Sequence, residues 1–160
     1  KLVLVNSFGL GQEIAIALRL LALPFVGRLS FPTRQGAALV LKHNVYDRNV
    51  IPDEWIELSY QKYGLPGTKR AILNLIETNL NLLGVRKTVF SPLVEQLPSI
   101  AQPALVIWGQ HDRILPVAHA HIAAKGLPNA RLHIFNPCGH WPHVERPEEF
   151  NRLIVEFLAS

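Results

Sequence analysis

The sequence predicts an α/β fold in which a parallel sheet with helices over its faces is interrupted by a helical insert. Three short apolar runs have the composition of buried parallel strands, and turn residues stop each of them: Leu2–Val5, Ala104–Trp108 and Ala130–Phe135. Helical segments follow the last two runs, and this alternation is typical of a parallel sheet. A long helical stretch separates the first run from the other two.

The insert is expected to span residues 12–98, and the sheet resumes after it. Apolar residues within the insert recur at spacings of three and four, which favours helices that pack on a core. The helices expected there are Gln12–Leu23, Thr33–Lys42, Pro52–Lys62, Thr68–Leu83 and Ser91–Gln96. Beyond the insert, Val117–Lys125 has helix composition and ends at Gly126. The last segment begins with Pro147 and two acids, as a helix commonly does.

Composition is that of an ordinary globular protein, with 160 residues, 49% hydrophobic and 18% charged. The 16 basic residues outnumber the 12 acidic ones but are scattered, which argues against nucleic-acid binding. The most apolar stretch, residues 14–29, contains Arg19, Pro24 and Gly27, so no membrane span is expected. The single cysteine, Cys138, favours a reducing, cytoplasmic location. The sequence leaves open whether the chain forms a homo-oligomer.

The start of the chain suggests that it is a fragment of a longer protein. The sequence contains no methionine, and Lys1 leads directly into a strand of the buried type. We therefore expect an incomplete sheet, with strands missing before Lys1.

Two loops carry the residues that are suited to chemistry. In a parallel sheet the ligand site lies beyond the carboxyl ends of the strands. Asp112 follows the second predicted strand and His140 follows the third, 28 residues later. Either one alone would be interpreted as a turn cap or an ordinary loop histidine. As a pair they are placed to act as an orienting carboxylate and a general base.

The two loops resemble the end of an α/β-hydrolase. The pattern Trp108-Gly-x-x-Asp112-x-x-x-Pro116 is followed by Gly139-His140 and by Glu145-x-Pro147. The family order along the chain is nucleophile, acid and histidine, so the resemblance implies that Asp112 is the triad acid and His140 the triad base. It further implies core residues 1–11 (strand 6 and its loop), a helical cap at 12–98, and core residues 99–160 with strands 7 and 8.

The nucleophile is expected upstream of Lys1, because no serine here has the small-residue setting of the family's Gly-x-Ser-x-Gly elbow. Ser7 comes closest, since Gly9 lies two residues after it, but Val5 occupies a position that needs a small residue. Cys138 is a second alternative, although its neighbours are not a strongly activating cationic cluster. The chain alone is therefore expected to be inactive.

The resemblance implies triad-dependent hydrolysis of a small apolar substrate at an ester or carbon–carbon bond. The segment from Cys138 to Glu145 is especially similar to that of meta-cleavage-product hydrolases. The alternatives are epoxide or haloalkane hydrolysis with an aspartate nucleophile, and a non-catalytic ligand-binding member of the same fold. We expect Phe8, Leu10 and Trp141 to line the substrate pocket, with ordinary packing as the alternative for each.

No cofactor is expected, because triad hydrolysis needs only water. A metal site is an alternative interpretation, because six of the seven histidines lie between His111 and His143. The spacing is poor for one: His119 and His121 lie two apart in a predicted helix and would face different sides.

Overall fold

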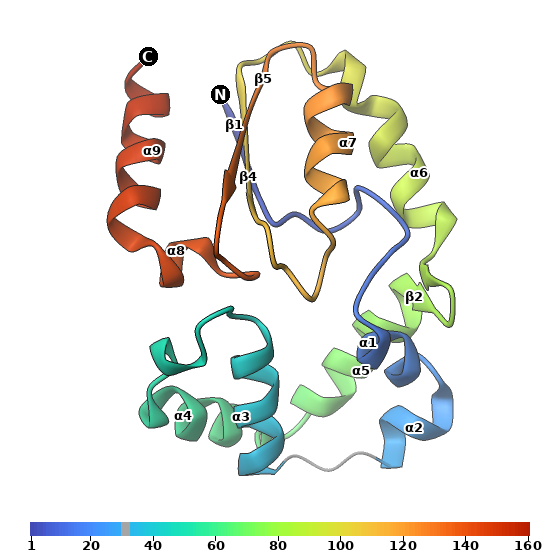
Figure 1. Ribbon diagram of the computed structural model, residues 1–160. Helices are drawn as coiled ribbons and strands as arrows, with labels where there is room; N and C mark the ends of the chain where they lie inside the picture. The colour runs from blue at the N-terminus through green and yellow to red at the C-terminus, as the bar shows by residue number, and fades with distance from the viewer. Residues whose placement is uncertain (30–32) are drawn as a thin grey trace.

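The computed structural model describes residues 1–29 and 33–160 and contains a three-stranded parallel sheet (Figure 1). The strand order is β1–β4–β5, with β1 at Leu2–Val5, β4 at Ala104–Gly109 and β5 at Ala130–Phe135. Leu2 pairs with Ala104, and Ala104 pairs with Ala130. The three strands therefore run in the same direction and end at one edge, as the sequence predicts.

Helices cover both faces of this sheet (Figure 1). On one face, α9 (Pro147–Ala159) packs on alternate residues of β4 in a cluster whose buried members are Leu105, Ile107, Phe135, Cys138 and Phe157. On the other face, α7 (Ala118–Gly126) contributes Ala120 and Ala123 to a larger cluster that contains Val106 and Trp108. The two-residue period of a strand thus supplies both cores.

The segment between β1 and β4 is mainly helical, as predicted. It contains these helices in order: α1 Ile16–Leu21, α2 Pro24–Leu29, α3 Arg34–His43, the 3-10 helix η1 Arg48–Val50, α4 Asp53–Tyr63, α5 Thr68–Asn79, α6 Lys87–Gln96 and the 3-10 helix η2 Leu97–Ser99. The short helix α8 (Pro142–Glu145) lies between β5 and α9. None of the helices in the described part of the chain is long and apolar enough to cross a membrane.

Two predicted helices have different bounds because their backbone groups bond to other elements. The helix expected over Thr68–Leu83 ends at Asn79 and is followed by a hairpin of β2 (Leu80–Asn81) and β3 (Gly84–Val85). Val85 N donates to Gln12 O at 2.8 Å, and Gly84, with φ +125°, lies so close to Gln12 that a side chain would collide with its carbonyl oxygen.

The first helix starts later in the chain than predicted, and contacts of the same segment explain this. Gln12 O accepts a hydrogen bond from Val85 N, and Ala15 N donates to Ile114 O at 2.9 Å. Residues 12–15 therefore form no helix, and α1 starts at Ile16. The helix expected over Ser91–Gln96 starts earlier than predicted, at Lys87.

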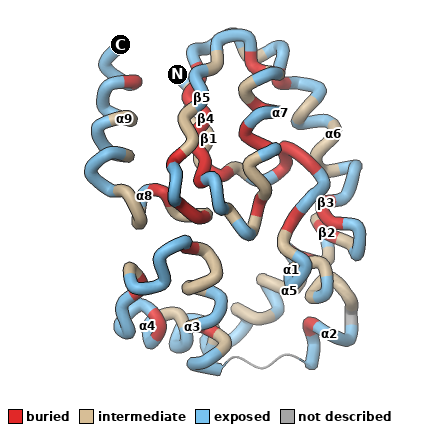
Figure 2. Tube along the Cα trace, viewed as in Figure 1, coloured by how far each residue is buried: buried red, intermediate tan, exposed pale blue. Residues whose placement is uncertain are grey.

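The helical segment has two parts. Helices α3 and α4 pack together below α8 in Figure 1, around a cluster of Ala37, Val45, Ile51 and Ile56. The other part, including α5 and the hairpin, shares the larger sheet-side cluster through Ile14, Ile76, Leu80 and Val85. Figure 2 shows buried residues concentrated along the strands and sparse in the helical segment. The division of the chain at residues 11 and 98 remains a prediction.

Candidate active site

The loops after β4 and β5 meet at the carboxyl edge of the sheet through a direct backbone contact. A side chain on Gly109, the last residue of β4, would collide with the carbonyl oxygen of Gly139. His111 N donates to Cys138 O at 2.9 Å and Gln110 N donates to Phe135 O at 2.9 Å. Two glycines therefore allow the loop that carries Asp112 to lie against the loop that carries His140.

Asp112 is held by four nitrogen partners in a site where its side chain has no exposed surface. Its Oδ1 accepts hydrogen bonds from Ile114 N at 2.7 Å and Leu115 N at 3.0 Å, which caps the turn after β4. Its Oδ2 accepts from Asn6 Nδ2 at 2.6 Å and lies 2.8 Å from His140 Nδ1. Asp112 is thus a turn cap and a partner of His140 at once.

His140 is oriented from both its ring and its backbone. Because a carboxylate only accepts hydrogen bonds, the contact with Asp112 assigns the proton to Nδ1 and leaves Nε2 as the basic nitrogen. The backbone N of His140 donates to Asn44 O at 2.6 Å, just beyond α3. The side chain is 19% exposed, and no residue in ranges 1–29 and 33–160 hydrogen-bonds Nε2. This nitrogen is free to exchange a proton with a reacting group.

Asn6 is a member of this site that sequence reasoning missed. It directly follows β1, is 6% exposed and has φ +42°, a conformation that asparagine tolerates better than most residues. Its N donates to Ile107 O at 3.0 Å, which places its amide beside Asp112. The sequence signal that identifies Asn6 is a polar residue at the carboxyl end of a parallel strand, the edge where ligand sites lie.

The three residues expected to line the substrate pocket lie in different surroundings. Phe8 is 43% exposed, and Leu10 is buried in the larger sheet-side cluster. Trp141 is partly buried and packs on the cluster of α3 and α4. The structure therefore does not bring Leu10 and Trp141 into one cluster, and a role of these three residues toward a substrate remains a prediction.

An apolar cavity lies within the helical segment instead. Its volume is about 270 Å³, and helices α1, α3, α4 and α5 supply most of its lining: Leu18, Leu21, Thr33, Gly36, Ala37, Val40, Tyr63, Lys69, Ile72, Leu73 and Ile76. The sequence predicts an apolar substrate but does not identify these residues as a pocket, because the cavity forms between helices that lie apart in the chain.

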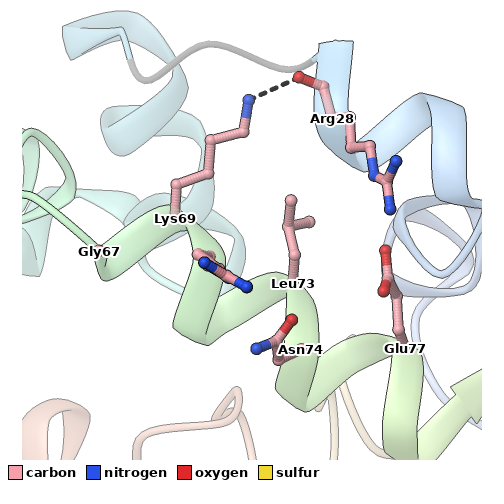
Figure 3. Close-up of a pocket in the computed structure, with 7 residues that line it drawn as sticks. Arg28, Gly67, Lys69, Leu73, Asn74 and Glu77 are labelled. Atoms are coloured by element: carbon pink, nitrogen blue, oxygen red, sulfur yellow. Dashed lines mark hydrogen bonds between the residues drawn. The ribbon is translucent and has the colours of Figure 1, made fainter.

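A larger groove of about 560 Å³ lies between α2 and α5 and carries mostly charged side chains (Figure 3). Lys69 Nζ donates to Arg28 O at 2.7 Å across it, while the Arg28 and Glu77 side chains point toward one another. Its lining contains no residue from the loops of Asp112 and His140.

In the described part of the chain, neither alternative nucleophile hydrogen-bonds to His140. Burial raises the pKa of the Cys138 thiol to about 12, with a further contribution from Glu145, so the thiolate is scarce at neutral pH. Cys138 is fully buried, and its Sγ lies 3.6 Å from Glu145 Oε1. Among the described residues no serine hydroxyl, including that of Ser7, hydrogen-bonds to His140.

Three other histidines lie in different surroundings. His119 is fully buried in α7 and its Nε2 lies 3.2 Å from Glu13 Oε2, whereas His121 is exposed on the opposite side of the helix. Burial lowers the pKa of His143, and the nearby His140 lowers it further. Within residues 1–29 and 33–160 there is no group of three or more His, Cys, Asp or Glu residues that could hold a metal ion.

Comparison with known proteins agrees with the predicted fold. Residues 34–147 match the family model for the alpha/beta hydrolase fold. A 2-hydroxymuconate semialdehyde hydrolase from Pseudomonas putida is 30% identical over 179 residues, which cover 97% of this chain and 61% of the relative.

Two solved structures are similar over the whole length of the described fold. A meta-cleavage product hydrolase from Pseudomonas fluorescens IP01 has a TM-score of 0.77 and 25% identity, covering 98% of this chain and 54% of its own. A 2-hydroxy-6-oxo-6-phenylhexa-2,4-dienoate hydrolase from Rhodococcus sp. strain RHA1 has a TM-score of 0.80 at 23% identity, covering 100% and 55%. This chain thus spans between about half and three-fifths of the length of these relatives, and it belongs to the alpha/beta hydrolase fold family.

Proposed function

We propose that Asp112 and His140 are the acid and the base of a hydrolytic triad. The observation that carries the proposal is the 2.8 Å contact between Asp112 Oδ2 and His140 Nδ1 beside a ring nitrogen without a partner among the described residues. A fully buried carboxylate with four nitrogen partners cannot turn away, so it fixes the imidazole ring. In this arrangement Nε2 faces the reacting group while Nδ1 stays bonded to Asp112.

In the proposed mechanism His140 Nε2 removes a proton as the new bond forms. With a serine nucleophile, Nε2 takes the hydroxyl proton as the oxygen attacks a carbonyl carbon, then returns it to the leaving group; water hydrolyses the acyl ester in the same way. Asp112 stabilises the imidazolium in both steps. The relatives are longer than this chain, and we assign the nucleophile to the additional part of the protein.

We propose a small apolar substrate that is cut at a carbon–carbon bond, with an ester as the next choice. Two features support the carbon–carbon bond: the likeness to a 2-hydroxymuconate semialdehyde hydrolase at 30% identity, and the likeness to a meta-cleavage product hydrolase in fold. The cavity of about 270 Å³ among apolar helical residues supports an apolar group on the substrate.

The experiment uses the full-length protein that carries this chain, assayed with 2-hydroxymuconate semialdehyde, a p-nitrophenyl ester and a 1-haloalkane. We expect turnover of the first or second compound and its loss in His140→Ala. The matched control is His121→Ala, an exposed histidine on α7, which should retain wild-type kcat. Halide release without the other reactions would favour an aspartate nucleophile, and binding without turnover would favour a ligand-binding protein.

We also propose a cytoplasmic location, because the one cysteine of the sequence is buried and free, as suits a reducing compartment. Cell fractionation tests this, and recovery of the protein outside the cytoplasm would contradict it.

A further inference from the structure

We propose that Glu145 is a positioning residue that ties the His140 loop to the turn Asn44–Asp47 of the cap, so that docking of the cap sets the position of the base. This inference rests on the proposed role of His140 and adds the residue that couples it to the cap. Glu145 is the last residue of α8, five residues after His140.

The two oxygens of Glu145 bind the two sides of this junction, which is the contact between the His140 loop and the turn Asn44–Asp47. Oε1 accepts a hydrogen bond from Gly139 N at 2.6 Å and lies 3.6 Å from Cys138 Sγ, both in the loop of His140. Oε2 accepts from Tyr46 N at 2.7 Å and Asp47 N at 3.3 Å, both in the turn after α3. One carboxylate therefore joins segments about 98 positions apart in the sequence.

Two further contacts hold the same junction without Glu145. His140 N donates to Asn44 O at 2.6 Å. A side chain on Gly139 would lie 2.7 Å from Tyr46 N and 2.8 Å from Asn44 O, so only glycine lets the two backbones approach this closely. The residue next to the proposed base is thus in direct contact with the cap backbone.

The turn Asn44–Asp47 is itself fixed to the helices of the cap. Asn44 Nδ2 donates to Val40 O at 2.7 Å, and Asp47 Oδ1 accepts from Asn49 N at 2.9 Å. Val45 is 1% exposed and belongs to the cluster of α3 and α4 on which Trp141 packs. A shift of these helices would therefore move the turn as a unit and, through Glu145 and Asn44, move His140.

Position 145 needs a carboxylate because every partner of Glu145 is a hydrogen-bond donor. Glutamine has one acceptor oxygen and one amide group that donates two hydrogens. In Glu145→Gln, the amide group of the glutamine would point at the backbone N–H of either Gly139 or Tyr46, so one of these donors would lose its acceptor. The two segments should then separate even though the side chain keeps its size.

The test compares Glu145→Gln with Glu148→Gln, an exposed glutamate in the first turn of α9, in the full-length protein. In Glu145→Gln we expect hydrogen exchange at Tyr46 and Gly139 amides to rise and the His140 ring signals to shift in NMR spectra. Because a misplacement of about 1 Å can cost about 100-fold in rate, we expect kcat to fall by about 10- to 100-fold, with a smaller change in KM. Glu148→Gln should match the wild type in all readouts.

Gly139→Ala is an independent second variant, because it wedges the junction apart while Glu145 remains. It should raise amide exchange at Tyr46 and lower kcat as Glu145→Gln does. If Glu145→Gln does not fold, Glu145→Asp replaces it, because the shorter carboxylate cannot span both sides and should give the same pattern.

Two results would overturn the proposal. Unchanged exchange at Tyr46 and Gly139 in Glu145→Gln would show that the carboxylate does not hold the junction. Faster exchange with unchanged His140 ring signals would show that the junction does not position the base. If the wild type has no hydrolytic activity, the proposed function fails, while exchange and the ring signals still decide the role of Glu145.

Discussion

Every residue of β4 from Ala104 to Trp108 is at most 1% exposed, whereas α1 contains no buried residue and α3, α4 and α5 contain one each. The sheet is packed on both faces, and its strand ends fix Asn6 and Asp112 through backbone geometry. The helical segment instead presents many apolar side chains to solvent, such as Leu39 at 72% and Leu75 at 67%.

This difference in packing separates the surroundings of Asp112 from those of the apolar cavity. Asp112, the proposed acid, lies in the closely packed part, because the β1–β4 ladder sets the position of its neighbours. His140 lies at the boundary, bonded to Asp112 on one side and to Asn44 on the other. The apolar cavity lies in the helical segment, where residues with few buried neighbours adjust at lower free-energy cost.

The largest effect expected from this comparison is on stability, and one matched pair of substitutions measures it. Ile107→Ala, at a residue with no exposed surface in β4, should lower the free energy of unfolding by about 2–5 kcal/mol. Ile16→Ala, at a residue 70% exposed in α1, should change it by less than about 0.5 kcal/mol. Urea unfolding of both variants gives the two values, and similar values would contradict the contrast between the sheet and the helical segment.

A smaller effect should appear in the pH dependence of stability at Cys138. Burial raises the pKa of this thiol from 9.0 to about 12 in the folded protein. Since the folded state keeps the proton when the unfolded state has lost it, the stabilisation is complete below about pH 9 and is lost as pH rises toward about 12. The free energy of unfolding should therefore fall over this range.

Cys138→Ser is an unsuitable control for this test because it introduces a hydroxyl into the apolar cluster, so Cys138→Ala is compared. The alanine variant should lose less stability than the wild type between pH 9 and pH 12. Equal losses would mean that the buried thiol does not contribute.

The sequence predicted the parts of the fold that depend on local pattern. The strands and the loops of Asp112 and His140 follow from apolar runs stopped by turn residues. The helical spacing of Leu80 and Leu83 predicts helix where the structure has the hairpin of β2 and β3, because the hairpin contacts Gln12, which is distant in the sequence.

The remaining members of the candidate site depend on contacts between distant segments. Asn6 lies 106 positions from its partner Asp112, and Glu145 lies about 99 positions from Tyr46. Neither pairing has a local signature. For Leu10 the local pattern misleads: it follows a strand end and is predicted to line the pocket, but it is buried in the larger sheet-side cluster.

The most direct test of the proposed pair is the turnover number of Asp112→Asn in the full-length protein, beside Asp53→Asn as an exposed control in α4. Asparagine keeps the size of the side chain but removes the carboxylate that holds His140 Nδ1–H, so kcat should fall by about 10⁴-fold while circular dichroism is unchanged. Asp53→Asn should keep wild-type kcat. A folded Asp112→Asn variant with turnover within about twofold of the wild type would contradict the assignment of Asp112 and His140 as the catalytic acid and base.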